Sequence, residues 1–165
     1  MKYLVIAALL LASCAFLSAK VPSFQKLAKG ERVEVTFSSS GCFHHSTELF
    51  IFQGNKVEVY ELATTWSHEK QERLTVDRMA LGELVLSSDD CKQLDELFKF
   101  YSKPVFGGCT TVDTIVVKHY NEKDLLSTTD FRDGTCATYD MKSLLTFLDL
   151  RQRLAEAQPS AKGDF

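Results

Sequence analysis

The chain has 165 residues, with 19 Lys+Arg against 22 Asp+Glu and a net charge of −3 at pH 7. Its basic residues are scattered singly among acids and form no basic patch. Proteins that bind nucleic acid need such a patch to neutralise phosphates. We therefore expect no nucleic-acid partner.

The first residues have the layout of a secretory signal. Lys2 is followed by an almost unbroken apolar stretch, residues 3–17, which ends at Ser18-Ala19-Lys20. A positive start, an apolar run and small residues at its end are typical of a cleaved signal peptide. Because a membrane-crossing helix needs about 20 apolar residues, the stretch is too short for an anchor. We predict a signal peptide over residues 1–19 and an exported protein.

Two cleavage positions compete inside this leader. Leu11-Ala12-Ser13-Cys14 resembles the lipobox of bacterial lipoproteins, whereas Leu17-Ser18-Ala19 suits ordinary signal peptidase. Cleavage before Cys14 would leave a diacylated cysteine, and two or more acyl chains anchor a protein stably. That lipid is the only membrane contact we expect. The sequence leaves open a membrane-anchored lipoprotein and a free secreted or periplasmic protein.

The mature chain has the size of one domain. About 145 to 150 residues remain after either cut, enough to bury roughly two thirds of the surface that the unfolded chain exposes. Loss of Lys2 leaves 18 Lys+Arg against 22 Asp+Glu, a net charge of −4. We predict one domain over residues 20–157 and a disordered tail over residues 158–165.

With Cys14 assigned to the leader, four cysteines remain, and an even number in an oxidising compartment predicts disulfides. A hairpin of residues 112–120 and 125–131 that places Tyr120 opposite Leu125 would also place Cys109 opposite Cys136. Opposed strand positions bring Cβ atoms close to disulfide distance. We predict Cys109–Cys136 on this ground, and Cys42–Cys91 by elimination. A single bulge would spoil the register.

Period-two alternation predicts strands through most of the chain. It covers residues 32–37, and a hairpin of residues 48–52 and 57–62 flanks Gly54-Asn55, a pair suited to a two-residue turn. Another strand or pair is expected between residues 73 and 86, broken near Gly82. Asp133-Gly134 closes the second hairpin.

Two segments change to helical periodicity. Behind the cap candidates Ser87–Asp90, apolar residues recur at three- and four-residue spacing up to Tyr101, and Pro104 limits the helix. Asp140 is a candidate cap for a final helix with a broad apolar stripe. The predicted fold is α+β: an antiparallel sheet of roughly five to seven strands in hairpins, with two amphipathic helices on one face. Equal spacings from Cys42 and Cys109 to their turns also suggest an internal strand–strand–helix duplication.

The densest group of reactive side chains is Cys42-Phe43-His44-His45. Thiolate and imidazole groups bind zinc, so His44 and His45 are candidate metal ligands, but paired Cys-x-x-Cys or His-x-x-x-His spacings are absent. A histidine-activated Cys42 or Cys109 is a second reactive hypothesis. The chain has no Gly-x-Ser-x-Gly, phosphate-binding loop or His-Glu-x-x-His motif. We predict no catalytic residue and no cofactor.

The only tryptophan, Trp66, falls in a stretch predicted as a polar loop, residues 64–68. It could anchor a partner or fold back as a core lid. Export and cross-linking cysteines favour a non-enzymatic binding or interaction module of the cell envelope, with an unknown protein or small ligand as partner. The alternative is a small secreted hydrolase or metal-binding protein that uses the Cys42–His45 region. A third hypothesis is a structural lipoprotein that works through its acylated terminus.

Overall fold

The computed structural model describes residues 21–42, 44–103, 107–136 and 143–157. The leader with Cys14 and the tail 158–165 lie outside this part of the chain. No helix in the described part is long and apolar enough to cross a membrane. The elements, in chain order, are η1 (Phe24–Lys26), β1 (Glu31–Ser40), β2 (His45–Gln53), β3 (Lys56–Ser67), β4 (Glu72–Val85), α2 (Ser88–Tyr101), β5 (Val112–Asn121), β6 (Asp124–Asp133) and α4 (Phe147–Ala157).

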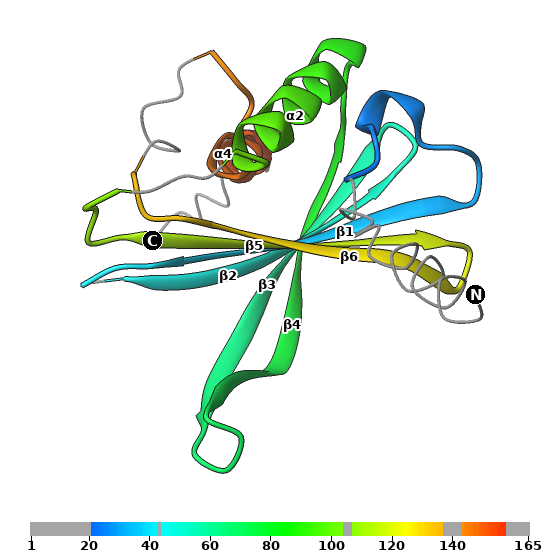
Figure 1. Cartoon of the computed structure of the whole chain (residues 1–165). Helices are drawn as coiled ribbons and strands as arrows, with labels where there is room; N and C mark the ends of the chain where they lie inside the picture. The colour runs from blue at the N-terminus through cyan, green and yellow to red at the C-terminus, as the bar shows by residue number, and fades with distance from the viewer. Residues whose placement is uncertain (1–20, 43, 104–106, 137–142, 158–165) are drawn as a thin grey trace, which may run out of the picture.

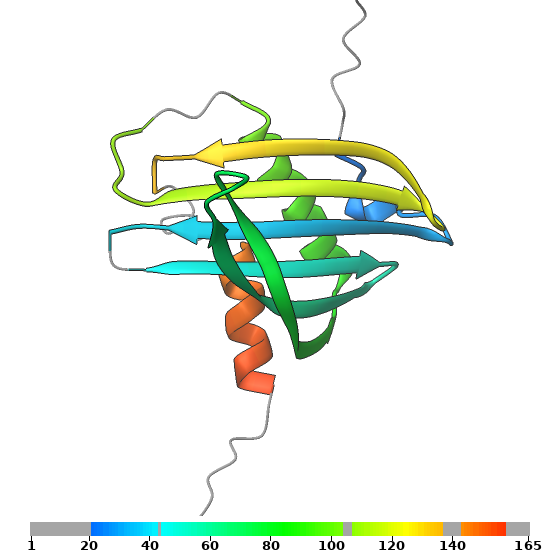
Figure 2. The same cartoon turned by 90° about the horizontal axis from the view of Figure 1, so that it is seen from below.

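The strands form one antiparallel sheet in the order β4-β3-β2-β1-β5-β6. β4 and β6 are therefore its edges. Figure 2 shows β6 at one side of the sheet next to β5, while the β3–β4 hairpin crosses the central strands in this view. The six-stranded antiparallel sheet and two helices confirm the α+β class.

The first predicted hairpin is confirmed with its register. β2 and β3 are joined by Gly54-Asn55, and Phe52 lies opposite Val57 while Phe50 lies opposite Val59. Gly54 has φ of 60°, a conformation that glycine adopts without steric cost. All four apolar side chains of these pairs are buried, so the hairpin's shared face belongs to the core.

The second hairpin has the predicted pair at its turn but a different register beyond it. Tyr120 lies opposite Leu125, as expected, and His119 lies opposite Ser127, so Leu126 is an extra residue in β6. This bulge shifts every following pair by one position. Cys109 and Cys136 lie outside the strands, in the segments that lead into β5 and out of β6, because β5 begins at Val112 and β6 ends at Asp133.

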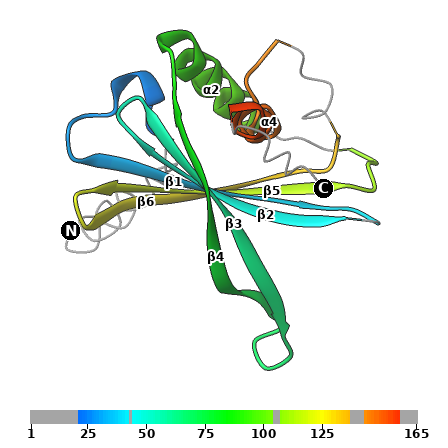
Figure 3. The same ribbon diagram turned by 180° about the vertical axis from the view of Figure 1, so that it is seen from behind.

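The hairpin of β3 and β4 is longer than the sequence predicted. β3 continues to Ser67, so the loop predicted over residues 64–68 is wrong for all but its last residue. Register shifts occur next to Val59 and Ala63, and the predicted break near Gly82 coincides with the first of them. Figures 1 and 3 show the outer half of this hairpin extending away from the other four strands.

Helix α2 begins where the sequence predicted. The Ser87 hydroxyl accepts a hydrogen bond from the Asp90 backbone N–H, and the Asp90 carboxylate accepts one from the Ser87 backbone N–H. This capping box satisfies two backbone donors that a helix start otherwise leaves unpaired. Arg153 of α4 donates to the same carboxylate at 2.8 Å, which links the two helices.

Helix α4 begins later than predicted. The expected cap, Asp140, lies outside the described residues, and the helix starts at Phe147 behind Thr146. Thr146 and Asp149 exchange side-chain-to-backbone hydrogen bonds in a second capping box. The predicted apolar stripe is partly confirmed, because two of its members, Phe147 and Leu154, are buried in the helix; Leu150, which was not among them, is buried as well.

The core joins both helices to the sheet through aromatic rings. The Phe147 ring of α4 lies 5.3 Å from that of Phe37, 5.1 Å from that of Phe50 and 5.9 Å from that of Phe98 on α2. The Phe98 ring in turn contacts those of Phe24 and Phe131.

The internal strand–strand–helix duplication stays a prediction. The element order does not support two equal halves, because four strands precede α2 whereas two lie between α2 and α4.

A charged group also fastens α4 to the sheet. The Arg151 guanidinium lies 4.0 Å from the Glu48 carboxylate on β2 and 3.8 Å from the Glu61 carboxylate on β3. Burial raises the pKa of Glu48, while Arg151 opposes that rise. The folded chain therefore holds a proton on Glu48 more tightly than the unfolded chain does.

This raised pKa predicts a pH-dependent stability. The stability that Glu48 contributes through its raised pKa is fully present below the pKa of the unfolded chain, near 4.5. It is lost as the pH rises through the higher pKa of the folded chain. We expect Glu48→Gln to become steadily more stable relative to the wild-type protein as the pH rises from 4.5 towards 7. Urea unfolding at several pH values measures this difference. Glu69→Gln, at an exposed position in the turn between β3 and β4, keeps Glu48 and should not share the trend. A pH-independent difference for Glu48→Gln would contradict the assignment.

Candidate ligand-binding cleft

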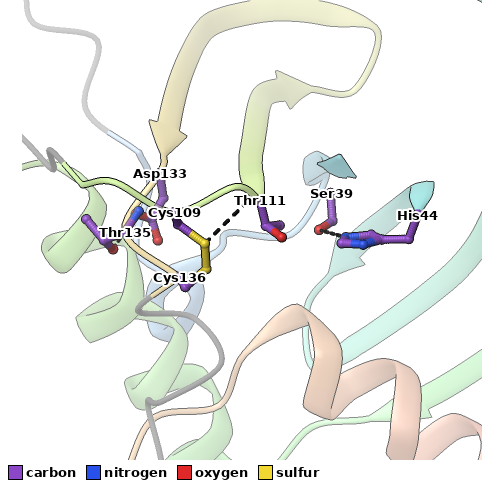
Figure 4. The surroundings of a disulfide bond; sticks show 7 residues. All are labelled: Ser39, His44, Cys109, Thr111, Asp133, Thr135 and Cys136. Carbon is purple, nitrogen blue, oxygen red and sulfur yellow. Dashed lines mark hydrogen bonds between the residues drawn. A yellow bond between two sulfur atoms is a disulfide. The ribbon is translucent and has the colours of Figure 1, made fainter. Parts of the chain in front are cut away.

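The predicted Cys109–Cys136 disulfide is confirmed (Figure 4). Its Cα atoms are 5.7 Å apart, within the ordinary range for a disulfide. The Cys109 backbone N–H donates to the Gly134 carbonyl at 2.9 Å, and the Asp133 carboxylate accepts from the Thr135 backbone N–H and hydroxyl. The bridge therefore closes the end of the β5–β6 hairpin opposite its turn, despite the bulge.

Gly107 makes the close approach of these two segments feasible. A Cβ at this position would lie 2.5 Å from the Thr135 Cα and 2.7 Å from the Gly134 carbonyl oxygen, both on the backbone. Such contacts cannot be relieved by turning a side chain. Gly107, two positions before Cys109, thus allows the chain to pass against the segment that carries Cys136.

The second predicted disulfide, Cys42–Cys91, is wrong. Cys42 is exposed in the turn between β1 and β2, Cys91 is buried in α2, and both are free. Burial, and then the nearby carboxylates of Asp90 and Asp95, raise the pKa of the Cys91 thiol. This raised pKa leaves little of the reactive Cys91 thiolate at neutral pH. The pairing by elimination failed because it assumed that every cysteine was in a disulfide.

The two candidate metal ligands, His44 and His45, lie at the start of β2. The His44 ring accepts or donates a hydrogen bond with the Ser39 hydroxyl at 3.1 Å (Figure 4), and the His45 ring lies 3.5 Å from the Thr47 hydroxyl. Burial, Arg73 and His44 lower the pKa of His45. Within the described ranges, no three His, Cys, Asp or Glu side chains gather as a metal site would require.

Trp66 lies on β3 opposite Arg73 in the extended hairpin. Its side chain is 46% exposed, so the core-lid interpretation is wrong. A partner-binding role for Trp66 stays a prediction. Neither the small cavity beside Gly54 and Leu86 nor the cleft described next has Cys42, His44, His45 or Trp66 in its lining.

A cleft of about 880 Å³ lies between α2 and the β5–β6 hairpin. We name it the α2 cleft. Helix α2 contributes Asp95, Glu96, Phe98 and Lys99 to its wall, and Ser102 adds to it just after the end of the helix. The strands contribute His119, Thr129 and Phe131, and residues 21–23 with Lys26 close one end. Its volume falls within the usual range for small-ligand sites, about 300–1,000 Å³.

Packing at the back of the α2 cleft holds its wall in place. The rings of Phe98 and Phe131 are 5.8 Å apart, which fixes α2 against β6. The Asp95 carboxylate accepts hydrogen bonds from the Ser23 hydroxyl and the Phe24 backbone N–H, which fix η1 against α2. These contacts span 71 and 72 positions of sequence, so the cleft is a product of tertiary structure.

His119 provides a polar group inside this apolar frame. Its side chain is 13% exposed, and its Nε2 atom is buried with no hydrogen-bond partner among the residues described. The nearest acid is Glu31, whose carboxylate lies 3.7 Å from Nε2, beyond hydrogen-bond distance. Leaving a buried polar atom unpaired costs about 1–3 kcal/mol. A bound molecule with a polar group could satisfy it.

The rim of the α2 cleft carries charges of both signs. Lys99 pairs with Glu96 at 3.3 Å, and both are exposed. Lys26 is exposed and has no ion-pair partner in the part of the chain that the structure describes. The cleft thus combines an apolar floor, one unsatisfied imidazole nitrogen and a hydrated rim.

Sequence reasoning missed this site. His119, Phe98 and Phe131 belong to no motif in the sequence, so nothing there marked them as members of one site. A search of protein-family models finds none that matches the chain, and a search of curated proteins finds no match either. The geometry of the described residues is therefore the basis for a functional assignment.

Proposed function

We propose that this protein is an exported, non-enzymatic binding module of the cell envelope, and that the α2 cleft is its ligand site. The observation that carries the proposal is the cleft itself: about 880 Å³, with an apolar floor and an unsatisfied buried nitrogen. Apolar cavities with a few converging polar groups are the usual form of small-ligand sites.

The arrangement of helices supports a site on this side of the sheet. Figures 1 and 3 draw α2 and α4 on the side opposite the extended β3–β4 hairpin. In our proposal both helices cover one face of the sheet. The α2 cleft then opens on that face, where α2 lies next to the edge strand β6.

Export is supported by the leader-like sequence and by the Cys109–Cys136 disulfide, since disulfides persist in oxidising compartments. The lipoprotein and free forms differ at the mature N-terminus. Mass measurement separates them: diacylglycerol on Cys14, or an unmodified start near Lys20. A chain that keeps its leader would remove the export part of the proposal.

The rival hypothesis of a hydrolase or metal protein that uses the Cys42–His45 region has weaker support. The Ser39–His44 contact could in principle activate a serine, but Ser39 is only 2% exposed. A nucleophile must reach the substrate's reacting atom. Cys42 is accessible, yet it is not among the residues that line the α2 cleft.

A pair of substitutions on one strand tests the proposed site. Thr129 lines the α2 cleft, whereas Thr128, its neighbour on β6, is exposed and points to the other face of the sheet. Thr129→Trp should fill the cleft, and Thr128→Trp should leave it open. We expect aromatic and aliphatic fragments that bind the wild-type chain in ligand-observed NMR to lose about tenfold or more in affinity for Thr129→Trp alone.

Thermal melts of both variants supply the control, because tryptophan suits a strand at either position. Equal fragment binding by wild type and a folded Thr129→Trp variant would place the fragments elsewhere and reject the α2 cleft. Loss of binding in both variants would point instead to a general disturbance of β6 and would also count against the site.

A further inference from the structure

The outer half of the β3–β4 hairpin, which extends away from the other strands in Figures 1 and 3, has two different faces. Both register shifts add a residue to β4, Val76 or Leu81, and leave β3 regular. Val57 and Val59 point into the core, so the even-numbered residues of β3 point to the opposite side. Directly paired residues share a side. The pairs on that side are Leu62–Arg78, Thr64–Thr75 and Trp66–Arg73, and we name these six residues the arginine face.

The acidic side chains of the same stretch point the other way. The pairing with β3 places Glu61, Glu72 and Asp77 on the core side of the hairpin. The contact of Glu61 with Arg151 of α4 agrees with this placement, because α4 packs on the core side through Phe147. Residues 60–67 and 72–80 therefore separate their charges, with both arginines on one face and all three acids on the other.

Both arginines are available to bind an anion. Arg73 and Arg78 are exposed, and neither takes part in an ion pair with another residue that the structure describes. The Arg78 guanidinium lies 4.2 Å from the centroid of the Tyr60 ring, a cation–π contact that holds it in place. Stacking on a ring leaves the N–H groups at the edge of the guanidinium, where a carboxylate can bind through two hydrogen bonds.

Trp66 adds an apolar surface beside these cations. Its side chain is 46% exposed, and it lies directly opposite Arg73. The hydroxyl groups of Thr64 and Thr75 follow it along the hairpin, before the position of Arg78. The two arginines pair with β3 positions four residues apart, which at the usual rise of a strand is about 13 Å. The arginine face is therefore a row of an aromatic ring, hydroxyl groups and two separated cations.

This row suits a long anionic chain without bulky side chains. A single small anion does not reach both arginines. Peptides and proteins are usually held by side chains that enter pockets. Neither the α2 cleft nor the cavity beside Gly54 and Leu86 has a residue of the arginine face in its lining. A polysaccharide needs no such pocket, because its sugar rings can lie flat on an aromatic ring and its hydroxyl groups can pair with threonines.

We propose that the arginine face binds an acidic polysaccharide, a chain of sugar units that carry carboxylate groups. One sugar ring stacks on Trp66, and carboxylates along the chain pair with Arg73 and Arg78. The proposal gives a partner chemistry to Trp66, which the sequence singled out and the α2 cleft does not use. This surface is separate from the α2 cleft, so the inference goes beyond the proposed function and does not depend on it.

Trp66 reports binding at this face directly, because it is the only tryptophan of the chain. Its fluorescence is followed while the full mature chain is titrated with polygalacturonate, with the uncharged polysaccharide dextran or with monomeric galacturonic acid. We expect polygalacturonate to change the emission and to bind about tenfold or more tightly than either of the others. Added salt should weaken this binding, because exposed charges are screened.

Substitution of the two arginines tests the assigned residues. We expect Arg73→Gln and Arg78→Gln together to lower polygalacturonate affinity by about tenfold or more. Lys92→Gln, which removes an exposed charge from α2, is the control for net charge and should bind as the wild type does. Equal affinity of the double variant and wild type, or an equal loss in Lys92→Gln, would overturn the proposal.

Other occupants give different results. Binding of poly-glutamate as tight as that of polygalacturonate would mean that the face takes acidic peptides and would overturn the polysaccharide assignment. Self-association of the wild-type chain in sedimentation, abolished in the double arginine variant and with no response to polygalacturonate, would instead make the face an interface between copies. Each of these outcomes leaves the α2 cleft untouched, so the proposed function is tested separately by its fragments.

Discussion

Replacing Cys109 and Cys136 together by serine should lower the free energy of unfolding by about 3–4 kcal/mol. The bridge closes a loop with a sequence separation of 27 residues, and the chain-entropy relation gives this value for a loop of that length. The pair also closes the β5–β6 hairpin, which contributes His119, Thr129 and Phe131 to the α2 cleft. We therefore expect fragment affinity to fall along with stability.

Urea unfolding of the double variant under oxidising conditions measures the effect. Cys42→Ser is the matched control, because Cys42 is exposed and free and its replacement should change stability by no more than about 0.5 kcal/mol. Equal stability of the double variant and wild type would show that the bridge does not brace the native chain. A loss in Cys42→Ser as large as in the double variant would show that Cys42 has a structural role missed here.

Replacing Phe147 by alanine should cost about 3–5 kcal/mol, the usual range for a buried phenylalanine. Its side chain is fully buried, and its ring contacts aromatic rings of β1, β2 and α2. No other described residue makes ring contacts with all three elements. The variant should therefore loosen α4 and α2 together. Since whole domains are stable by about 5–15 kcal/mol, the variant will be close to unfolding.

Circular dichroism during urea titration checks this expectation, with Leu126→Ala as the control. Leu126 is 54% exposed at the β6 bulge, so its truncation should change the free energy of unfolding by about 0.5 kcal/mol or less. A cost below about 1 kcal/mol for Phe147→Ala would mean that the aromatic cluster does not hold α4 to the sheet.

Local signals in the sequence predicted the local parts of the fold. Gly54-Asn55 located a two-residue turn and fixed the register of its strands, and Ser87 with Asp90 located the start of α2. These predictions succeeded because turn and cap chemistry depends on residues only two or three positions apart.

Long-range features were predicted less well. Nothing in the sequence shows the bulge at Leu126, yet it moves Cys109 and Cys136 out of strand register. The Cys109–Cys136 bridge forms because loop geometry compensates, so the pair was right although the register behind it was not. Cys42 and Cys91 were paired by counting alone, and counting carries no information about distance.

The α2 cleft could not have been predicted from motifs. Its residues come from four separate segments, around η1, along α2, at His119 on β5 and on β6, and none has a spacing typical of a binding site. Sequence analysis singled out the Cys42–His45 cluster and Trp66 because their side chains are reactive or of a rare type. A cavity forms where packed helices and strands leave space between them, and the sequence pattern alone does not show where that happens.

Chemical-shift mapping of the unmodified mature chain tests the central claim most directly, that the α2 cleft is the binding site. A fragment library is titrated into isotope-labelled protein, and perturbed amides are located on the sheet and helices. We expect the largest changes at residues 95–102 of α2 and 127–131 of β6, together with His119. Changes centred on Trp66 or on the turn that contains Cys42, with α2 and β6 unaffected, would contradict the assignment.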